Sequence, residues 1–369
     1  MECEKLFACI DGLSEEYLAV LEDVCRLESP THDKGRVDAV GRYFAQRARA
    51  KGWQVEVRKM EGAGDPLCIT LNPQIMAAPI TLSGHIDTVH PVGSFGAEIV
   101  RRDEENLYGP GTADCKGGVV AAFLAMDALE RCGFAARPVQ LIIQTDEETN
   151  STNSQQQTVQ FMCEKAEGSL AFLNGECTRQ GAAVIGRKGI LRYALTVHGD
   201  AAVAQAEANR KLQQIEQMKQ WDGLICNSRM VYNTAPDQAC VLIVTIFFVD
   251  DEQCRQAQAL VQDVAQQPCG DGCTCTLEQV SLRPSMPLTR RNEQLMQRLN
   301  EIWQTNGLQG LETVISPAGS DAAYITRMGI PCVDGIGVSG GLIHSTGEYI
   351  RLDSLAESAK RMAGAVWCL

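Results

Sequence analysis

The sequence has little basic charge and few histidines, and these shortages limit the classes of function that the protein can have. Its 369 residues contain 33 lysines and arginines against 46 aspartates and glutamates, which gives a formal charge of −13. Because a phosphate backbone is bound mainly by cationic side chains, the acidic excess argues against a nucleic-acid partner. Hydrophobic residues make up 45% of the chain and charged residues 21%, so a packed core is expected and a disordered or fibrous chain is excluded.

We also expect no segment that would direct the chain into or across a membrane. Residues 1–5 show no basic region leading into an apolar stretch, so we expect no secretory leader. The longest apolar run, 241–249, is broken only by Thr245 and reaches about half the length of a membrane span. It is better interpreted as a buried strand, and no membrane partner is expected.

Sixteen cysteines are present, but none lies in a Cys-x-x-Cys motif. Disulfide frameworks belong mostly to small secreted domains, so a large chain without a leader predicts reduced thiols and a cytoplasmic location. The missing motif makes a thiol-based redox protein the least favoured function. Cys269, Cys273 and Cys275 are a competing explanation for zinc binding, although they have no matching fourth ligand nearby.

Up to about residue 186, helical segments alternate with short apolar runs. Helical spacing of apolar residues occurs at 15–27, 36–51 and 119–131, and apolar runs occur at 67–71, 80–82 and 139–144. Thr31 and Asp33 are candidate cap or turn residues before the second helix. This order predicts an α/β domain with a mixed or mostly parallel sheet covered by helices, in which strand ends are the usual place for a site.

The pattern then changes to a compact α+β unit with the order βαββαβ, which is ferredoxin-like. The predicted elements are strands at 191–197, 226–231, 239–249 and 274–280, with helices at 201–219 and 252–266. Helices are expected again at 291–305 and from Asp353. We therefore predict a larger domain formed by residues 1–186 and 283–369 and interrupted by a smaller domain at 187–282.

The first candidate site segment, Ser83–Val89, follows the predicted strand at 80–82. If the strand continues, its period of two places His85 and Asp87 on the same side. A carboxylate there can accept one N–H of the imidazole and so turn the other nitrogen toward a metal. Alone, this pair is more typical of an ordinary polar strand end.

Four further acids and one histidine lie in similar positions. Asp114 sits in the glycine-rich segment 111–118, Glu147 and Glu148 follow the strand at 139–144, and Glu176 follows another apolar stretch. His344 lies near the C-terminus between glycines, and the chain has only five histidines. Each segment alone is more typical of a solvated loop or a capped helix, but their convergence at predicted strand ends favours a site.

Two histidines and several carboxylates suit a pair of divalent ions. Zinc fits this donor set best, and oxygen ligands would also accept manganese or cobalt. Two ions about 3.5–4 Å apart need a carboxylate between them, and they would lower the pKa of a shared water toward about 7.

Taken together, these segments resemble those of the M20 family of di-metal peptidases and amidohydrolases. That family includes carboxypeptidase G2-like glutamate carboxypeptidases, aminoacylases and succinyl-diaminopimelate desuccinylase. The matching segments, in the family's order, are 84–89, 111–118, 146–148, 175–176 and 319–322, followed by His344 with Glu348.

The resemblance implies a role for each candidate residue. The metal ligands would be His85, Asp114, Glu148, Glu176 and His344, with Asp114 bridging the two ions. Asp87 would orient His85. Glu147 would be the general base, which takes a proton from the water between the ions and later delivers it to the leaving amine.

The resemblance also implies that the smaller domain is a lid, often used for dimerisation through edge strands. Asn233 matches the family's lid asparagine near the substrate, and Arg187, Gly319 and Ser320 are further candidate substrate contacts. The lid histidine of relatives is replaced by the segment 201–203, which ends in Val203. An Asp-x-Arg on the long lid strand is replaced by 245–247, which ends in Phe247.

Losing such a lid donor costs about 10²–10³ in turnover if nothing replaces it. We therefore expect retained chemistry with altered substrate recognition or dimer geometry.

These observations predict a cytoplasmic metal-dependent hydrolase that cleaves an amide or peptide bond of a small peptide or N-acyl amino acid. The segment 329–337 is most like the carboxypeptidase G2-type branch, which favours a free carboxylate beside that bond. The alternative is a metal-binding but catalytically silent relative with a ligand-binding or regulatory role, which the altered lid motivates. Glu147 favours the enzyme, because a silent relative needs no base beside the water.

Overall fold

A computed structural model of the chain describes residues 3–178, 181–232, 239–270 and 272–369. The chain divides into two compact units. The first contains residues 1–185, 288–314 and 324–369, and the second contains residues 186–287 and 315–323. No helix in the described ranges is both long and apolar enough to span a membrane.

A six-stranded sheet forms the centre of the first unit. Its strand order is β1 (Gln54–Val57), β2 (Leu67–Leu71), β6 (Val139–Gln144), β3 (Ile80–His85), β7 (Ala171–Asn174) and β14 (Cys332–Val333). The last four of these run parallel, while β2 pairs antiparallel with both of its neighbours. Since β3 and β6 are almost wholly buried, both faces of this part of the sheet are covered. The mixed, mostly parallel sheet predicted from the sequence is confirmed.

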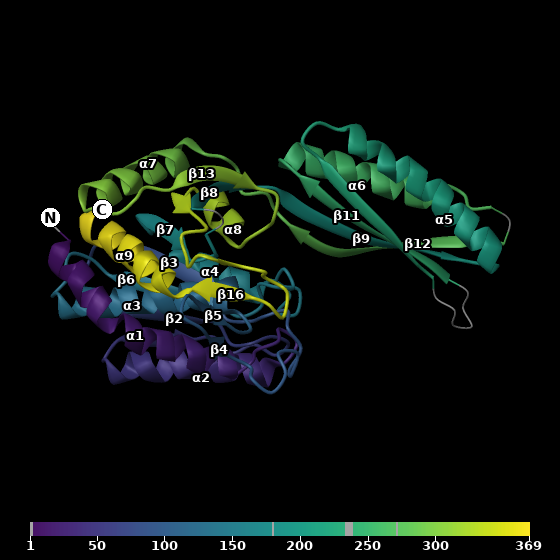
Figure 1. Cartoon of the computed structure of the whole chain (residues 1–369). Coiled ribbons are helices and arrows are strands. Elements are labelled where there is room, and N and C mark those ends of the chain that lie inside the picture. Colours follow the sequence, from purple (N-terminus) through teal and green to yellow (C-terminus); the bar gives the residue numbers. More distant parts are fainter. Residues whose placement is uncertain (1–2, 179–180, 233–238, 271) are drawn as a thin grey trace. The chain divides into compact units, whose positions relative to one another are not determined.

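Helices cover this sheet (Figure 1). They are α1 (Glu4–Arg26), α2 (Lys34–Ala50), α3 (Gly117–Arg131), α4 (Gln157–Ala166), α7 (Arg290–Thr305) and α9 (Leu352–Cys368). α3 is built almost entirely from small and apolar residues, packs on β3 and β6, and also contacts α1 and α9. Its burial from Gly117 to Leu129 fixes the position of the turn just before it.

The remaining short elements belong to the first unit or lie where the chain passes from one unit to the other. A small sheet has the order β15 (Gly340–Gly341), β16 (Tyr349–Arg351), β5 (Asn106–Tyr108) and β4 (Arg101–Arg102). β8 (Ala182–Arg187) pairs with β13 (Glu312–Ser316), and α8 (Ala322–Arg327) is a short helix.

The second unit has the predicted βαββαβ order. Its elements are β9 (Gly189–His198), α5 (Ala201–Ile215), the short helix η2 (Glu216–Gln220), β10 (Ile225–Tyr232), β11 (Ala239–Phe248), α6 (Asp251–Gln266) and β12 (Thr274–Arg283). The sheet order β10-β11-β9-β12 is the ferredoxin-like one. Burial alternates along β9 and β11, so one face of the sheet packs on α5 and α6.

Candidate functional site

Three parallel strands end at one edge of the large sheet, and candidate residues follow each of them. His85 is the last residue of β3, Glu147 and Glu148 follow β6, and Glu176 comes two residues after β7. Because β3 lies between β6 and β7 in parallel register, their carboxyl ends meet. A site at this position is the usual one for such sheets.

Asp114 reaches the same edge through an irregular turn, η1 (Thr112–Lys116), that precedes α3. The turn starts at Gly111, whose φ of 77° favours glycine. A Cβ on Gly118 would lie only 1.8 Å from the carbonyl oxygen of Gly175, so α3 can approach the end of β7 only with glycine here. The glycines therefore bring the Asp114 carboxylate beside the residues that follow the strands.

The predicted ligands form two groups that share Asp114. His85 Nε2 lies 3.1 Å from Asp114 Oδ1 and 3.7 Å from Glu176 Oε1. His344 Nε2 lies 3.0 Å from Asp114 Oδ2 and 3.4 Å from Glu148 Oε2. All five residues belong to the first unit, so the structure brings all five predicted ligands together.

These spacings fit metal coordination. Two ligand atoms that are each about 2.1 Å from one tetrahedral ion lie roughly 3.4 Å apart. The four distances of 3.0–3.7 Å bracket this value. Each group also supplies one imidazole nitrogen and two carboxylate oxygens, donors that zinc and manganese both accept.

Asp87 contacts His85 Nδ1, the ring nitrogen that does not face Asp114. Its carbonyl oxygen lies 3.1 Å and its Oδ1 3.4 Å from His85 Nδ1. Both are acceptors, so Nδ1 carries a proton and Nε2 points to the cluster. The other oxygen, Asp87 Oδ2, accepts hydrogen bonds from the Thr31 hydroxyl and the Glu148 backbone N–H.

The charged groups of the cluster lie so close together that they shift one another's pKa values. Hydrogen bonds to Asp114 and Glu148 raise the pKa of His344 to about 10. Burial, together with the charge of Asp114, raises the pKa of Glu148 to about 7. Burial opposes ionisation of Asp114, but His344 and His85 hold its pKa well below the usual range.

Burial and neighbouring charges also shift the pKa values of Glu176 and His85. Burial and the charges of Asp114 and Glu147 raise the pKa of Glu176 well above its ordinary value. Burial favours the neutral form of His85, yet its contacts with Asp114 and Asp87 raise its pKa. The charge of Glu147 thus acts on the same cluster, and its own side chain is nearly buried. Without added positive charge, these carboxylates carry uncompensated repulsion.

Sequence reasoning assigned no role to a second histidine–carboxylate pair beside the cluster. His90 Nε2 lies 2.7 Å from Glu348 Oε2, and both residues are buried. Glu348 Oε1 accepts hydrogen bonds from the backbone N–H groups of Ala113 and Asp114, at 2.9 and 3.0 Å. These hydrogen bonds to Glu348 therefore stabilise the turn η1, which carries Asp114. The scarcity of histidine is the only sequence signal that could have drawn attention to His90.

Other predicted residues do not join the cluster within the first unit. Arg187, Gly319 and Ser320 belong to the second unit, where Arg187 Nη1 donates to the carbonyl oxygens of Ala318 and Gly319. Ser320 is buried. Asn233 lies outside the described residues.

The cysteine alternative for zinc gains no support. In the described part of the chain, two sets of three side chains bring all their ligand atoms within 4.8 Å of one another: His85 with Cys115 and Glu176, and His85 with Asp114 and Glu148. Neither includes Cys269, Cys273 or Cys275. The first set does contain a cysteine, Cys115, to which no sequence motif assigns a role.

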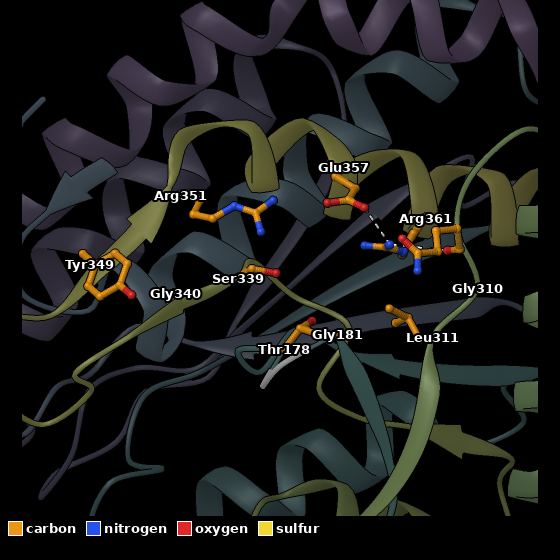
Figure 2. Close-up of a pocket in the computed structure, with 11 residues that line it drawn as sticks. Thr178, Gly181, Gly310, Leu311, Ser339, Gly340, Tyr349, Arg351, Glu357 and Arg361 are labelled. Carbon is orange, nitrogen blue, oxygen red and sulfur yellow. Dashed lines mark hydrogen bonds and ion pairs between the residues drawn. The ribbon is translucent and has the colours of Figure 1, made fainter. Parts of the chain in front are cut away.

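A separate polar pocket of about 400 Å³ also lies within the first unit (Figure 2). It is lined by parts of the segments 178–181 and 309–311, by β15 and β16, and by α9. Arg361 pairs there with Glu357, at 2.7 Å, and is itself buried. None of the proposed metal ligands lines this pocket, so it is distinct from the cluster.

Comparison with known proteins gives the class of the chain. A model described as peptidase family M20/M25/M40 matches residues 81–367. Carboxypeptidase G2 of Pseudomonas sp. (strain RS-16) is 24% identical over 95% of this chain and 88% of that protein. A match of 37% identity to succinyl-diaminopimelate desuccinylase of Rhodospirillum centenum covers 32% of this chain and only 33% of the relative's length.

Solved structures agree on the fold. A tripeptidase from Staphylococcus aureus has a TM-score of 0.77 at 20% identity and covers 96% of this chain and 97% of that one. A metallo-carboxypeptidase of the M20 family from Sulfolobus solfataricus has a TM-score of 0.71 at 14% identity, covering 95% and 98%. The chain belongs to the peptidase family M20/M25/M40. It is a hydrolytic enzyme of the kind that acts on peptide or amide bonds with the help of divalent metal.

Proposed function

We propose that the chain cleaves an amide or peptide bond of a small peptide or N-acyl amino acid, using two divalent ions of which zinc is the best fit. One observation carries this proposal. Each oxygen of the Asp114 carboxylate lies against a different histidine, and each histidine lies against a different glutamate. That arrangement suits two ions bridged by one carboxylate.

His85 and Glu176 would hold one ion, His344 and Glu148 the other, and Asp114 both. When bound, the ions would polarise the scissile carbonyl and lower the pKa of the attacking water. Asp87 would keep His85 in the tautomer that leaves Nε2 free for a metal.

Glu147 is the proposed general base. It would accept a proton from the attacking water and deliver that proton to the leaving nitrogen. Its neighbour Glu148 points to His344, whereas the charge of Glu147 acts on both Glu148 and Glu176. The two adjacent glutamates thus suit different tasks.

The second unit is the proposed lid, with Asn233, Arg187, Gly319 and Ser320 contributing to recognition of a substrate with a free carboxylate. Because Arg187 donates to the carbonyl oxygens of residues 318 and 319, it would act partly by holding the segment that contains Gly319 and Ser320. The relative carboxypeptidase G2, whose name denotes a carboxypeptidase, motivates the choice of a C-terminal carboxylate.

We also propose that the protein is a cytoplasmic homodimer that pairs through the second unit. The edge strands β10 and β12 each have one pairing partner in that sheet, so each can add another strand. All sixteen cysteines lie in the described part of the chain and form no disulfide there, which suits a reducing compartment. Light scattering tests the dimer, and a monomer at micromolar concentration would contradict it.

The proposed activity is tested by counting metals in the purified protein and then assaying a panel of dipeptides and N-acyl amino acids. We expect two ions per chain, turnover on substrates with a free carboxylate, loss of turnover after chelation, and recovery with zinc. Two ions without turnover on any substrate would favour the catalytically silent alternative, which the replacement of lid donors at Val203 and Phe247 motivates. Fewer than one ion per chain would contradict the metal centre itself.

A further inference from the structure

A buried thiol lies directly beside the proposed metal centre. Cys115 follows Asp114 in the chain and is fully buried. Its Sγ, one side-chain nitrogen of His85 and one carboxylate oxygen of Glu176 all lie within 4.8 Å of one another. His85 and Glu176 are the residues proposed to hold one of the two ions, so the sulfur faces that half of the centre.

The position of this sulfur is narrowly set by its surroundings. Cys115 Sγ lies 3.1 Å from the carbonyl oxygen of Gly175, to which the thiol donates a hydrogen bond. Gly175 is the residue before Glu176. On the other side, a Cβ on Gly84 would lie 3.2 Å from the sulfur, so the absence of a side chain on Gly84 leaves room for it.

We propose that Cys115 is an additional ligand for the ion held by His85 and Glu176, and that it gives this half of the centre a preference for soft divalent ions. The inference rests on the proposed function and deepens it. When the sulfur–metal bond forms, the S–H bond breaks and its proton passes to the buffer, while the Gly175 carbonyl loses its donor. Thiolate ligands favour zinc and cadmium, whereas sites made only of oxygen and imidazole also suit manganese.

A supporting role is the competing explanation. In that case the thiol stays protonated, keeps its hydrogen bond to Gly175, and only steadies the segment that carries Glu176. Replacing Cys115 would then weaken the binding of every ion to a similar degree. A ligand role instead predicts a loss that is selective for soft ions, so the two roles give different results.

The first test is the absorption spectrum of the wild-type protein loaded with two equivalents of cobalt(II). A thiolate bound to cobalt gives a near-ultraviolet charge-transfer band that nitrogen and oxygen ligands do not give. We expect this band in the wild type. Bound cobalt without the band would overturn the proposal, whatever any variant does. A chain that binds no cobalt would instead contradict the proposed function.

The second test assigns the band to one residue. Cys115→Ser should remove the band while the protein still binds cobalt. Cys68→Ser, which changes a buried cysteine on β2, is the matched control and should keep the band. A band that survives Cys115→Ser would overturn the assignment, because it would come from one of the other fifteen cysteines.

The third test measures selectivity by competition. The ratio of cadmium affinity to manganese affinity should fall by at least about tenfold in Cys115→Ser, a typical loss when a group at a metal site is removed. An equal loss for both ions would contradict a ligand role and establish the supporting one.

Discussion

At the scale of single residues, neighbours in the chain have different surroundings at the proposed centre. Glu148 Oε2 lies 3.4 Å from His344 Nε2, while Glu147 influences the cluster through its charge. His-x-Asp and Asp-Glu-Glu at strand ends made these residues predictable from the sequence, because parallel pairing of β3 and β6 brings the ends of the two strands together. Strand alternation does not place Asp87, since β3 ends at His85. The split between a ligand and a base at adjacent positions gives a direct test.

Glu147→Gln should keep both ions and lower kcat by about 10²–10⁴, because the amide cannot accept the proton of the water. Glu148→Gln is the matched control, with the same change one residue away, and should lose affinity for one ion. Metal counting and steady-state kinetics on both variants check this. Equal loss of metal in the two variants would show that the roles of base and ligand are not divided in this way.

Glu348 is the residue whose position sequence reasoning could not explain. Its carboxylate meets Ala113 and Asp114 only because the start of β16 packs beside the turn η1, a contact between segments over 230 positions apart in sequence. Local patterns carry no information about such contacts.

Glu348→Ala leaves two backbone N–H groups and His90 without their acceptor. We expect it to lower the free energy of unfolding by at least about 3 kcal/mol, since each of the three donors left unpaired costs about 1–3 kcal/mol. Urea unfolding of the metal-free protein measures this. Glu104→Ala, at an exposed position, is the control and should change stability by less than about 0.5 kcal/mol. An effect no larger than the control would show that Glu348 does not hold the turn.

At the scale of elements, the buried carboxylate of Asp127 contacts side chains from α1, from α3 and from the end of α2. Asp127 on α3 accepts a hydrogen bond from the Tyr17 hydroxyl on α1, at 2.7 Å. It also pairs with Arg131 on its own helix, and with Lys51, which follows α2, at 2.8 Å. Burial opposes its ionisation, but these partners outweigh that effect and lower its pKa.

Asp127→Asn should therefore destabilise the protein in a pH-dependent way. A carboxylate with a depressed folded-state pKa stabilises the fold above its unfolded pKa of about 3.9, and this contribution is lost as the pH falls through the folded value. We expect a loss of about 2 kcal/mol at pH 7, which shrinks as the pH falls below about 4. Denaturant unfolding from pH 7 to pH 3 measures it. A difference that stays constant with pH would show that the charge of Asp127 does not contribute.

Elements with a clear apolar pattern were predictable, and elements with mixed signals were not. β2 and β6 have the predicted bounds, because each is a short and mostly apolar run. The first half of α1 escaped prediction, since Gly12 interrupts it, yet burial of Leu6, Phe7 and Ile10 outweighs the roughly 1 kcal/mol cost of a helical glycine. α4 also escaped prediction, since it starts at the polar Gln157, yet it buries its apolar face.

At the scale of the whole molecule, the proposed centre is confined to one of the two units. The acidic excess of the chain includes five carboxylates at or beside the cluster, all of them in the first unit. Two divalent ions would bring the net charge of −13 to about −9. They would also relieve the repulsion that, in addition to burial, raises the pKa values of Glu148 and Glu176. If the second unit is the lid, metal binding and substrate closure would therefore depend on different parts of the chain.

That separation predicts the effect of removing most of the second unit. Arg187 and Met286 exchange backbone hydrogen bonds of 3.0 Å in both directions, as the two residues that flank a tight hairpin do. Residues 188–285 can therefore be replaced by the two-residue turn Asn-Gly, which closes such a pair without strain. The shortened protein should still bind two ions, since their proposed ligands lie in the first unit. Turnover should fall by at least about 10²–10³ through loss of the proposed lid donors, such as Asn233. Metal counting, circular dichroism and the substrate panel check this. A folded protein that has lost an ion would show that the second unit supplies a ligand, and full turnover would show that it is no lid.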